Sequence, residues 1–89
     1  MVSEKVRVKN PSGFHLRPAG MLCEAAVSFG SKIYFCKDGR DYNAKSVLSV
    51  LGAGVKSGDE IEIFCEGSDE TTALRALVEL VDSGFGEAV

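Results

Sequence analysis

The spacing of the apolar residues changes several times along the 89-residue chain, and this change limits the folds open to it. In some segments every second residue is apolar, which is typical of a strand with one buried face. In others the spacing is three and four, which is typical of a helix with one buried stripe. Gly-containing breaks separate the segments. A chain with both patterns in alternation is expected to pack helices against a sheet.

Four segments are predicted as strands. The first covers residues 2–8 and the last covers residues 60–66. Residues 31–37 and 40–43 flank Asp38-Gly39, a dipeptide typical of a two-residue hairpin turn. The residues that share one face of each strand are Val2, Glu4, Val6 and Val8 in the first, Ile33 and Phe35 in the second, and Ile61, Ile63 and Cys65 in the last.

Three helices are predicted, at about residues 16–29, 46–54 and 69–82. Pro18 suits the first turn of the first helix, where its missing N–H is not needed. Either Ser68 or Asp69 is expected to cap the third helix. The expected buried stripes are Ala19, Leu22, Cys23 and Ala26 in the first helix, and Leu74, Leu77, Val78 and Val81 in the third.

The predicted order of elements is therefore β-α-β-β-α-β-α. This order favours an α+β fold, an open-faced β-sandwich with a four-stranded antiparallel sheet and three helices on one face. The other face of the sheet, which carries Lys, Glu and Arg, is expected to meet water. We expect residues 1–89 to form a single domain.

Composition and charge argue against several classes of protein. A net charge of -3 and a pI of about 5.0 are unusual for a nucleic-acid binder. No apolar run approaches the ~18 residues of a membrane span, and MVSEKVRVKN lacks the apolar core of a signal peptide, so a cytoplasmic location is expected. Cys23, Cys36 and Cys65 form no C-x-x-C pair; we expect buried, reduced thiols and no metal site.

The segment GFHLRPAG, residues 13–20, places the only histidine at the start of the predicted first helix. A helix start offers free backbone N–H groups and the positive end of the helix dipole, and such places bind anions, phosphate especially. Arg17 adds a planar cation suited to phosphate oxygens. A neutral imidazole nitrogen can act as a nucleophile, so His15 is a candidate acceptor of a phosphoryl group.

A plainer interpretation of His15 is that it caps the helix or lies idle in a loop. The neighbouring residues favour the phosphoryl site, because Arg17 and the helix N–H groups would meet the added charge while Pro18 rigidifies the first turn. A metal centre is disfavoured, since no second histidine is present. A hydrolytic triad is disfavoured because the sequence places no serine or cysteine to use His15 as its base.

Residues 13–20 resemble the active-site segment of the HPr family, the histidine-containing phosphocarriers of the bacterial sugar phosphotransferase system. Residues 44–63, AKSVLSVLGAGVKSGDEIEI, resemble the regulatory-serine region of that family. The resemblance covers essentially the whole chain, and the family has the same β-α-β-β-α-β-α order. It implies that His15 accepts a phosphoryl group on Nδ1 from phosphorylated enzyme I and passes it to a sugar-specific enzyme IIA. Arg17 would steady that group, with no cofactor and no independent turnover.

The resemblance also implies that a dedicated ATP-dependent kinase/phosphorylase modifies Ser46, although this serine is equally suited to be a plain helix cap. The short second helix is apolar nearly all round and cannot bury every side chain. We expect Val50 to be core, and Leu48 and Leu51 to be largely on the surface. The partner-binding residues implied by the family are Leu16, Gly20, Val47, Leu48 and Leu51.

Three residues depart from the family pattern. Leu16 stands where Ala or Thr is common, and Gly52-Ala53 replaces a polar residue and Leu, so the second helix is expected to end early. Two other functions stay open. One is a regulatory module in which phosphorylated Ser46 binds a transcription regulator as a corepressor. The other is an unrelated α+β binding domain, for RNA for example, which the net charge opposes. We expect a monomer that binds neither nucleic acid nor membrane.

Overall fold

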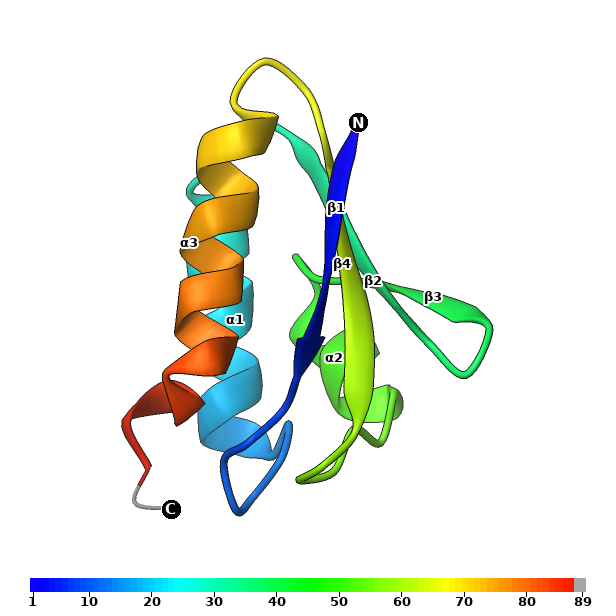
Figure 1. Ribbon diagram of the computed structural model, residues 1–89, viewed down its shortest axis with the longest axis vertical. Coiled ribbons are helices and arrows are strands. Elements are labelled where there is room, and N and C mark those ends of the chain that lie inside the picture. Colours follow the sequence, from blue (N-terminus) through cyan, green and yellow to red (C-terminus); the bar gives the residue numbers. More distant parts are fainter. Residues whose placement is uncertain (88–89) are drawn as a thin grey trace.

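The computed structural model of the chain describes residues 1–87 (Figure 1). Its helices and strands follow the predicted order, with one short 3₁₀ turn added at the end. The elements are β1 (Val2–Arg7), α1 (Leu16–Val27), β2 (Lys32–Lys37), β3 (Arg40–Asn43), α2 (Val47–Gly52), β4 (Glu60–Glu66), α3 (Glu70–Asp82) and the turn η1 (Gly84–Gly86).

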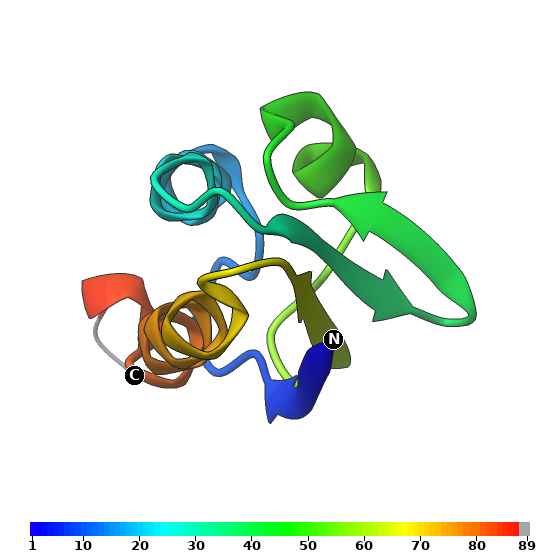
Figure 2. The same ribbon diagram turned by 90° about the horizontal axis from the view of Figure 1, so that it is seen from above.

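The four strands form one sheet in the order β1-β4-β2-β3, and all neighbours are antiparallel. The central strand β4 pairs Ile63 with Glu4 on one side and with Phe35 on the other. The view from above shows α1, α2 and α3 on one side of this sheet (Figure 2). The predicted open-faced sandwich, with three helices on one face of a four-stranded antiparallel sheet, is confirmed.

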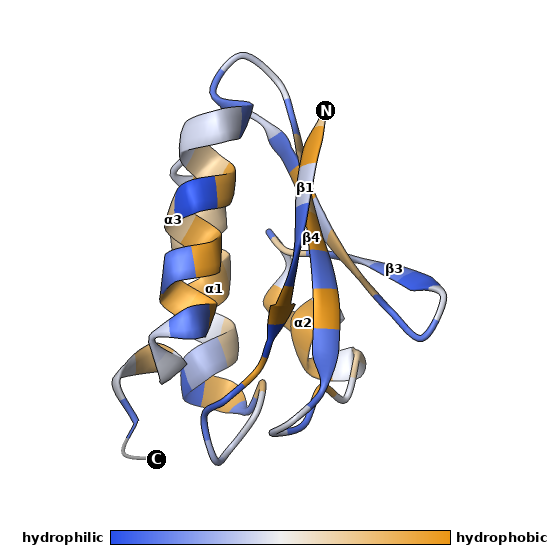
Figure 3. Ribbon diagram, viewed as in Figure 1, coloured by the Kyte–Doolittle hydropathy of each residue, from blue (hydrophilic) through white to orange (hydrophobic). Residues whose placement is uncertain are grey.

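The core lies between the sheet and the helices. Alternate strand residues are buried, among them Ile33, Phe35, Ile61 and Ile63, because successive side chains of a strand point to opposite faces. Hydrophobic and hydrophilic bands alternate along α3, because one face of this helix packs on the core and the other meets water (Figure 3). Each large apolar side chain buried in this way stabilises the fold by about 1.5–3 kcal/mol. The helix residues fully buried in the core include Leu22, Ala26, Leu77 and Val81.

The hairpin between β2 and β3 turns at Asp38-Gly39, as predicted. Both residues have positive φ, 52° and 79°, which is the backbone of a type I′ turn. Lys37 pairs directly with Arg40, so the loop has only the two residues needed for that turn type. Asn, Asp and Gly tolerate this backbone best, which is why the dipeptide identifies the hairpin from the sequence.

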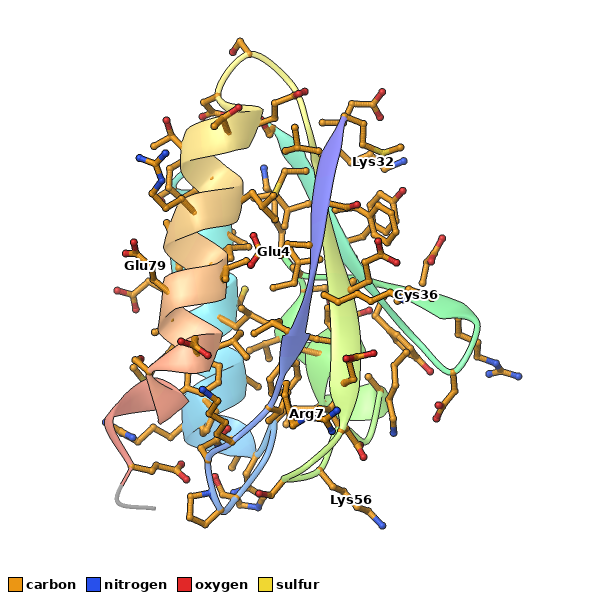
Figure 4. All side chains as sticks on the ribbon, viewed as in Figure 1. Glu4, Arg7, Lys32, Cys36, Lys56 and Glu79 are labelled. Atoms are coloured by element: carbon orange, nitrogen blue, oxygen red, sulfur yellow. The ribbon has the colours of Figure 1, made fainter. Side chains whose placement is uncertain are left out.

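The strand and helix faces differ from the prediction near β1. Val8 is buried but lies beyond the end of β1, and Glu4 points from β1 toward α3 yet stays exposed at the sheet edge (Figure 4). In α3 the fully buried residues are Ala73, Leu77 and Val81, whereas Leu74 and Val78 are only half-buried. Leu74 and Val78 line a surface hollow together with Glu4, at the place where α3 contacts the edge strand β1.

Asp69 immediately precedes α3, but its side chain makes no hydrogen bond to that helix. Its carboxylate instead accepts hydrogen bonds from the backbone N–H of Gly30 at 2.9 Å, from the N–H of Ser31 at 3.0 Å and from the Ser31 hydroxyl. Gly67 lies close by, and a Cβ on it would come 2.6 Å from Ser31 Oγ. Asp69 is therefore the N-cap residue of α3, as predicted, but its side chain does not cap the helix and instead ties the α1–β2 turn to the β4–α3 turn.

All three cysteines are free, but only Cys65 is fully buried. Cys36 is half-buried on β2, next to the inward-facing Phe35 and so on the open face of the sheet (Figure 4). Cys23 is half-buried on α1, with Sγ 3.2 Å from the carbonyl oxygen of Lys45. The prediction of three buried thiols is therefore wrong for Cys23 and Cys36, since the periodicity of a segment does not tell which elements will cover its two faces.

Two further findings concern residues 1–87. None of their helices combines the length and the apolar character that crossing a bilayer requires. These residues also contain no group of three or more His, Cys, Asp or Glu side chains that could bind a metal ion.

Candidate functional site

Backbone hydrogen bonds fix the loop between β1 and α1, and this arrangement requires a glycine at position 13. Gly13 N–H donates to the carbonyl of Asn10 at 3.1 Å, and Phe14 N–H donates to the carbonyl of Val55 at 3.0 Å. Gly13 has φ +61°, and a Cβ there would lie 2.5 Å from the Val55 oxygen. A side chain at this position would therefore both strain the backbone and collide with the neighbouring segment.

Phe14 anchors the loop in the core. Its buried ring meets Phe35 edge to face at a centroid distance of 5.6 Å and Phe85 in the same way at 5.9 Å. Aromatic rings prefer this arrangement, since the positive edge of one faces the negative face of the other. The residue before His15 is thus held by both the sheet and the C-terminal turn η1.

His15 occupies the N-cap position of α1, with extended backbone angles of φ -76° and ψ -177°. Its carbonyl accepts the hydrogen bond of Ala19 N–H at 2.8 Å, which begins the helix, while its exposed imidazole makes no capping bond. The N–H groups of Leu16 and Arg17 have no partner four residues back, and the first turn carries no acidic side chain. The imidazole therefore lies beside free donors at the positive end of a 12-residue helix.

Arg17 and Pro18 occupy the first turn of α1, as predicted. Arg17 is exposed, and its Nη1 donates to the carbonyl of Phe85 at 3.3 Å, so η1 holds the guanidinium near the start of the helix. Pro18 is almost completely buried and needs no hydrogen-bond partner for its nitrogen. The roles of His15, Arg17 and Pro18 in binding a phosphoryl group stay predictions.

The C-terminal segment contributes residues that sequence reasoning missed. Phe85 has φ +55° inside η1, which turns the chain back toward the β1–α1 loop. The side chain of Glu87 then accepts hydrogen bonds from Ser12 and Asn10 of that loop. The one sequence signal was an aromatic residue between two glycines after the third helix, GFG, which marks a tight turn with a buried side chain.

Ser46 is the N-cap of α2, and its half-buried hydroxyl accepts the hydrogen bond of Ser49 N–H at 3.2 Å. The hydroxyl of Ser49 in turn accepts from Asn43 N–H at 3.0 Å. Lys45, just before Ser46, reaches the carbonyl of Phe29 with its ammonium group at 2.8 Å. These bonds fix the segment before α2 against α1, and Ser46 performs the capping task that its plainer interpretation predicted.

The predicted partner-binding residues lie on α1 and α2, two helices that contact each other. Leu16 is 65% exposed and Leu48 is 79% exposed, which is unusual for large apolar side chains. Val50 is fully buried, as expected, and α2 ends at Gly52. Leu51 is half-buried because it packs against the core, so the prediction that it lies largely on the surface is wrong in degree. Gly20 and Val47 are also partly exposed.

A surface hollow of about 450 Å³ lies at the β2–β3 side of the sheet. Its lining residues include Lys32, Tyr34, Tyr42 and Lys45, and His15 is not among them. His15 instead stands on an exposed helix end, where a partner's surface can reach it without entering a cavity.

Comparisons with known proteins agree with this arrangement. The family model described as "PTS HPr component phosphorylation site" matches residues 2–83. The chain is 41% identical to the phosphocarrier protein HPr of Treponema pallidum, over 98% of this chain and 99% of that protein. It is 37% identical to the HPr-like protein Crh of Halalkalibacterium halodurans, over 92% of this chain and 98% of that protein.

Solved structures show the same fold over the full length. The crystal structure of HPr-C-His from Thermoanaerobacter tengcongensis has a TM-score of 0.97 and 38% identity, and covers 100% of both chains. Another crystal structure, of an HPr dimer from the same organism, has a TM-score of 0.78 and 39% identity, with 98% of this chain and 100% of that one covered. The monomer expected here therefore stays a prediction. With a family model across residues 2–83 and relatives matched end to end, the chain belongs to the HPr family of phosphocarrier proteins.

Proposed function

We propose that the chain, acting as one domain in the cytoplasm, accepts a phosphoryl group on His15 from phosphorylated enzyme I and passes it to sugar-specific enzyme IIA domains. The observation that carries this proposal is the exposed imidazole of His15 at the start of α1, with the guanidinium of Arg17 two residues away. Family membership supports the carrier role.

The chemistry needs a nucleophile and a place for negative charge. The lone pair of a neutral imidazole nitrogen attacks phosphorus, a P–N bond forms, and the bond from phosphorus to the donor breaks. The phosphoryl oxygens then lie near the N–H groups of Leu16 and Arg17 and the Arg17 side chain, all of which favour an anion. The second transfer reverses these steps, so the protein carries the group and completes no turnover alone.

Radiolabelled phosphoenolpyruvate and purified enzyme I test the proposal. We expect one acid-labile, base-stable phosphate per chain, as a phosphohistidine gives, and no label on His15→Ala. Arg17→Ala should still fold, because the side chain is exposed, but should accept the group about 100-fold more slowly through loss of charge stabilisation. A wild-type chain without label, or a His15→Ala chain that keeps it, contradicts the proposal.

A second candidate function is supported by Ser46 and by the Crh proteins among the relatives. In this regulatory role, a kinase moves the γ-phosphoryl group of ATP to the Ser46 oxygen, and the modified protein binds a transcription regulator as a corepressor. The hydroxyl already caps α2, two residues before the exposed Leu48. A dianion at this helix start is compatible with the fold, and its effect would fall on partners that dock over Leu48.

Ser46→Asp tests the regulatory role, which is compatible with the carrier function in one chain. Aspartate also caps helices well, so the variant should fold, and a purely regulatory protein should gain regulator binding. If a charge at Ser46 also regulates the carrier, Ser46→Asp should slow transfer from enzyme I about tenfold, an effect of about 1.4 kcal/mol. Ser68→Asp is the matched control, since Ser68 is exposed in the β4–α3 turn, at the opposite end of the molecule from the start of α1 (Figure 1). Unchanged transfer and no regulator binding by Ser46→Asp contradict the regulatory role.

A further inference from the structure

The carboxylate of Glu87 is bound to the loop that precedes His15. Its Oε2 accepts the Ser12 hydroxyl at 2.6 Å, and its Oε1 accepts the Ser12 N–H at 3.2 Å. The side-chain amide of Asn10 donates to the same Oε1 at 3.4 Å. Both oxygens of one side chain thus hold two residues of a loop that lies 75 positions or more away in sequence.

Asn10 extends these hydrogen bonds into the interior of the protein. It is fully buried, and its amide nitrogen also donates to the carbonyl of Gly13 at 2.7 Å and to the hydroxyl of Ser12 at 3.3 Å. Gly13, with its positive φ, comes directly before the buried Phe14 and the exposed His15. The contacts therefore run from Glu87 through Asn10 and Ser12 to the turn that presents the imidazole.

The same segment touches the other side of the site through Arg17. The carbonyl of Phe85, two residues before Glu87, accepts from the Arg17 guanidinium at 3.3 Å. The hydrogen bonds from Ser12 and Asn10, together with the positive charge of Arg17, lower the pKa of Glu87, so this carboxylate is ionised at neutral pH.

From this geometry we infer that Glu87 is a positioning residue for phosphoryl acceptance on His15, an inference that rests on the proposed function. It acts through its hydrogen bonds to Ser12 and Asn10, which fix the loop and with it the backbone at the start of α1. It does not touch the reacting atoms. Displacement of a reacting group by about 1 Å can slow a transfer step by as much as a hundredfold, so a loosened loop should be visible in the rate.

Two variants at Glu87 and one control test the inference. Glu87→Ala removes both acceptor oxygens, whereas Glu87→Gln keeps one oxygen that can still accept from Ser12. Glu79→Ala is the control, because Glu79 is an exposed acid on the outer side of α3 and is not among the partners of Ser12 and Asn10 (Figure 4). The initial rate of labelling by enzyme I and phosphoenolpyruvate is measured for each, with the thermal midpoint to verify folding and the NMR shift of the Ser12 amide to report on the loop.

We expect Glu87→Ala to be labelled about tenfold more slowly than the wild type, Glu87→Gln to recover part of that loss, and Glu79→Ala to match the wild type. The Ser12 amide shift should move in Glu87→Ala and stay in place in the control. A Glu87→Ala chain that is labelled at the wild-type rate, or is slow with an unmoved Ser12 amide, overturns the inference alone. A wild-type chain that takes no label overturns the proposed function, and the inference falls with it.

Discussion

Gly13, two residues before His15, has a backbone conformation and a close packing that favour glycine. Its φ of +61° is costly for any residue with a Cβ, and such an atom would lie 2.5 Å from the carbonyl oxygen of Val55 and 2.8 Å from Cα of Lys56. Those neighbours are backbone atoms, which cannot rotate away as the end of a side chain can. The conformation and the close approach thus require glycine for two independent reasons.

We predict that Gly13→Ala lowers the free energy of unfolding by about 2–4 kcal/mol, from the left-handed backbone and the overpacking together. Urea unfolding followed by circular dichroism measures the change. Phosphoryl acceptance should fall as well, because the loop must move to relieve the collision.

Gly20 provides the matched control for that prediction. It lies inside α1 without a positive φ, and a Cβ on it would meet no atom within 4 Å. Gly20→Ala should raise the free energy of unfolding by about 0.5–1 kcal/mol, since alanine loses less backbone freedom in a helix. Equal destabilisation by both substitutions would contradict the assignment of strain to Gly13.

At the scale of elements, Asp69 joins two turns at the end of the molecule away from the start of α1. Hydrogen bonds from the Ser31 hydroxyl and from the backbone N–H groups of Gly30 and Ser31 lower the pKa of its carboxyl group below the ordinary value. A carboxyl whose pKa is lower in the folded state stabilises the fold above its unfolded pKa of about 3.9. That contribution is lost as the pH falls through the lower, folded value.

We therefore predict that Asp69→Asn is less stable than the wild type at pH 7 and that the difference shrinks as the pH drops below about 4. Urea unfolding at a series of pH values measures both trends. Asp82→Asn is the control, as its pairing with Lys9 is on the surface and such pairs contribute little. An Asp69→Asn chain whose deficit is the same at pH 7 and at pH 2 would show that the charge of Asp69 has no part in it.

The elements themselves were predictable where the periodicity was long. All seven predicted strands and helices exist, because the spacing of apolar residues follows from the geometry of each element. The turn η1 was missed, since three residues with two glycines have no periodicity. Burial at the margins was also missed: whether Leu51, Leu74 or Cys36 is covered depends on how neighbouring elements cross, which a local pattern does not contain.

The candidate site, too, could be predicted from the sequence only where its residues are close together in the chain. His15, Arg17 and Pro18 lie within four residues of each other, so one local string was enough to suggest them. The contacts of Glu87 and of the Phe85 carbonyl with that region join residues 68 to 77 positions apart. The packing of Phe85 against Phe14 is one of the long-range contacts that bring these groups together, and no local pattern predicts it.

On the scale of the whole molecule, the reactivity of the Cys65 thiol measures how often the sheet and the helices separate. It lies on β4, the strand between β1 and β2, and is fully buried. Burial, with the negative charges of Asp69 and Glu70, raises the pKa of its thiol, so little reactive thiolate forms. Reaction of this thiol should therefore require separation of the sheet from the helices.

We predict that a Cys23→Ser, Cys36→Ser chain, which keeps only Cys65, does not react with a thiol reagent under native conditions and reacts at once in strong denaturant. The native chain should release two fast thiol equivalents, from the half-buried Cys23 and Cys36. A time course with a chromogenic disulfide measures both. Rapid reaction of Cys65 without denaturant would mean that the core opens locally at β4.

The pairing of β1 with β4 also bears on how the chain is made. β1 leaves the ribosome before β4, yet within residues 1–87 it is an edge strand whose one partner is β4. Ser3 and Glu62, joined across this pair, are 59 positions apart. At about 5–20 residues per second, roughly 3–12 seconds of synthesis pass before β4 is complete. During that interval β1 has exposed backbone donors and acceptors that could pair with another nascent chain. Glu4, Lys5 and Arg7 place three charges in a strand of six residues, and these charges disfavour such pairing until the chain's own partner arrives.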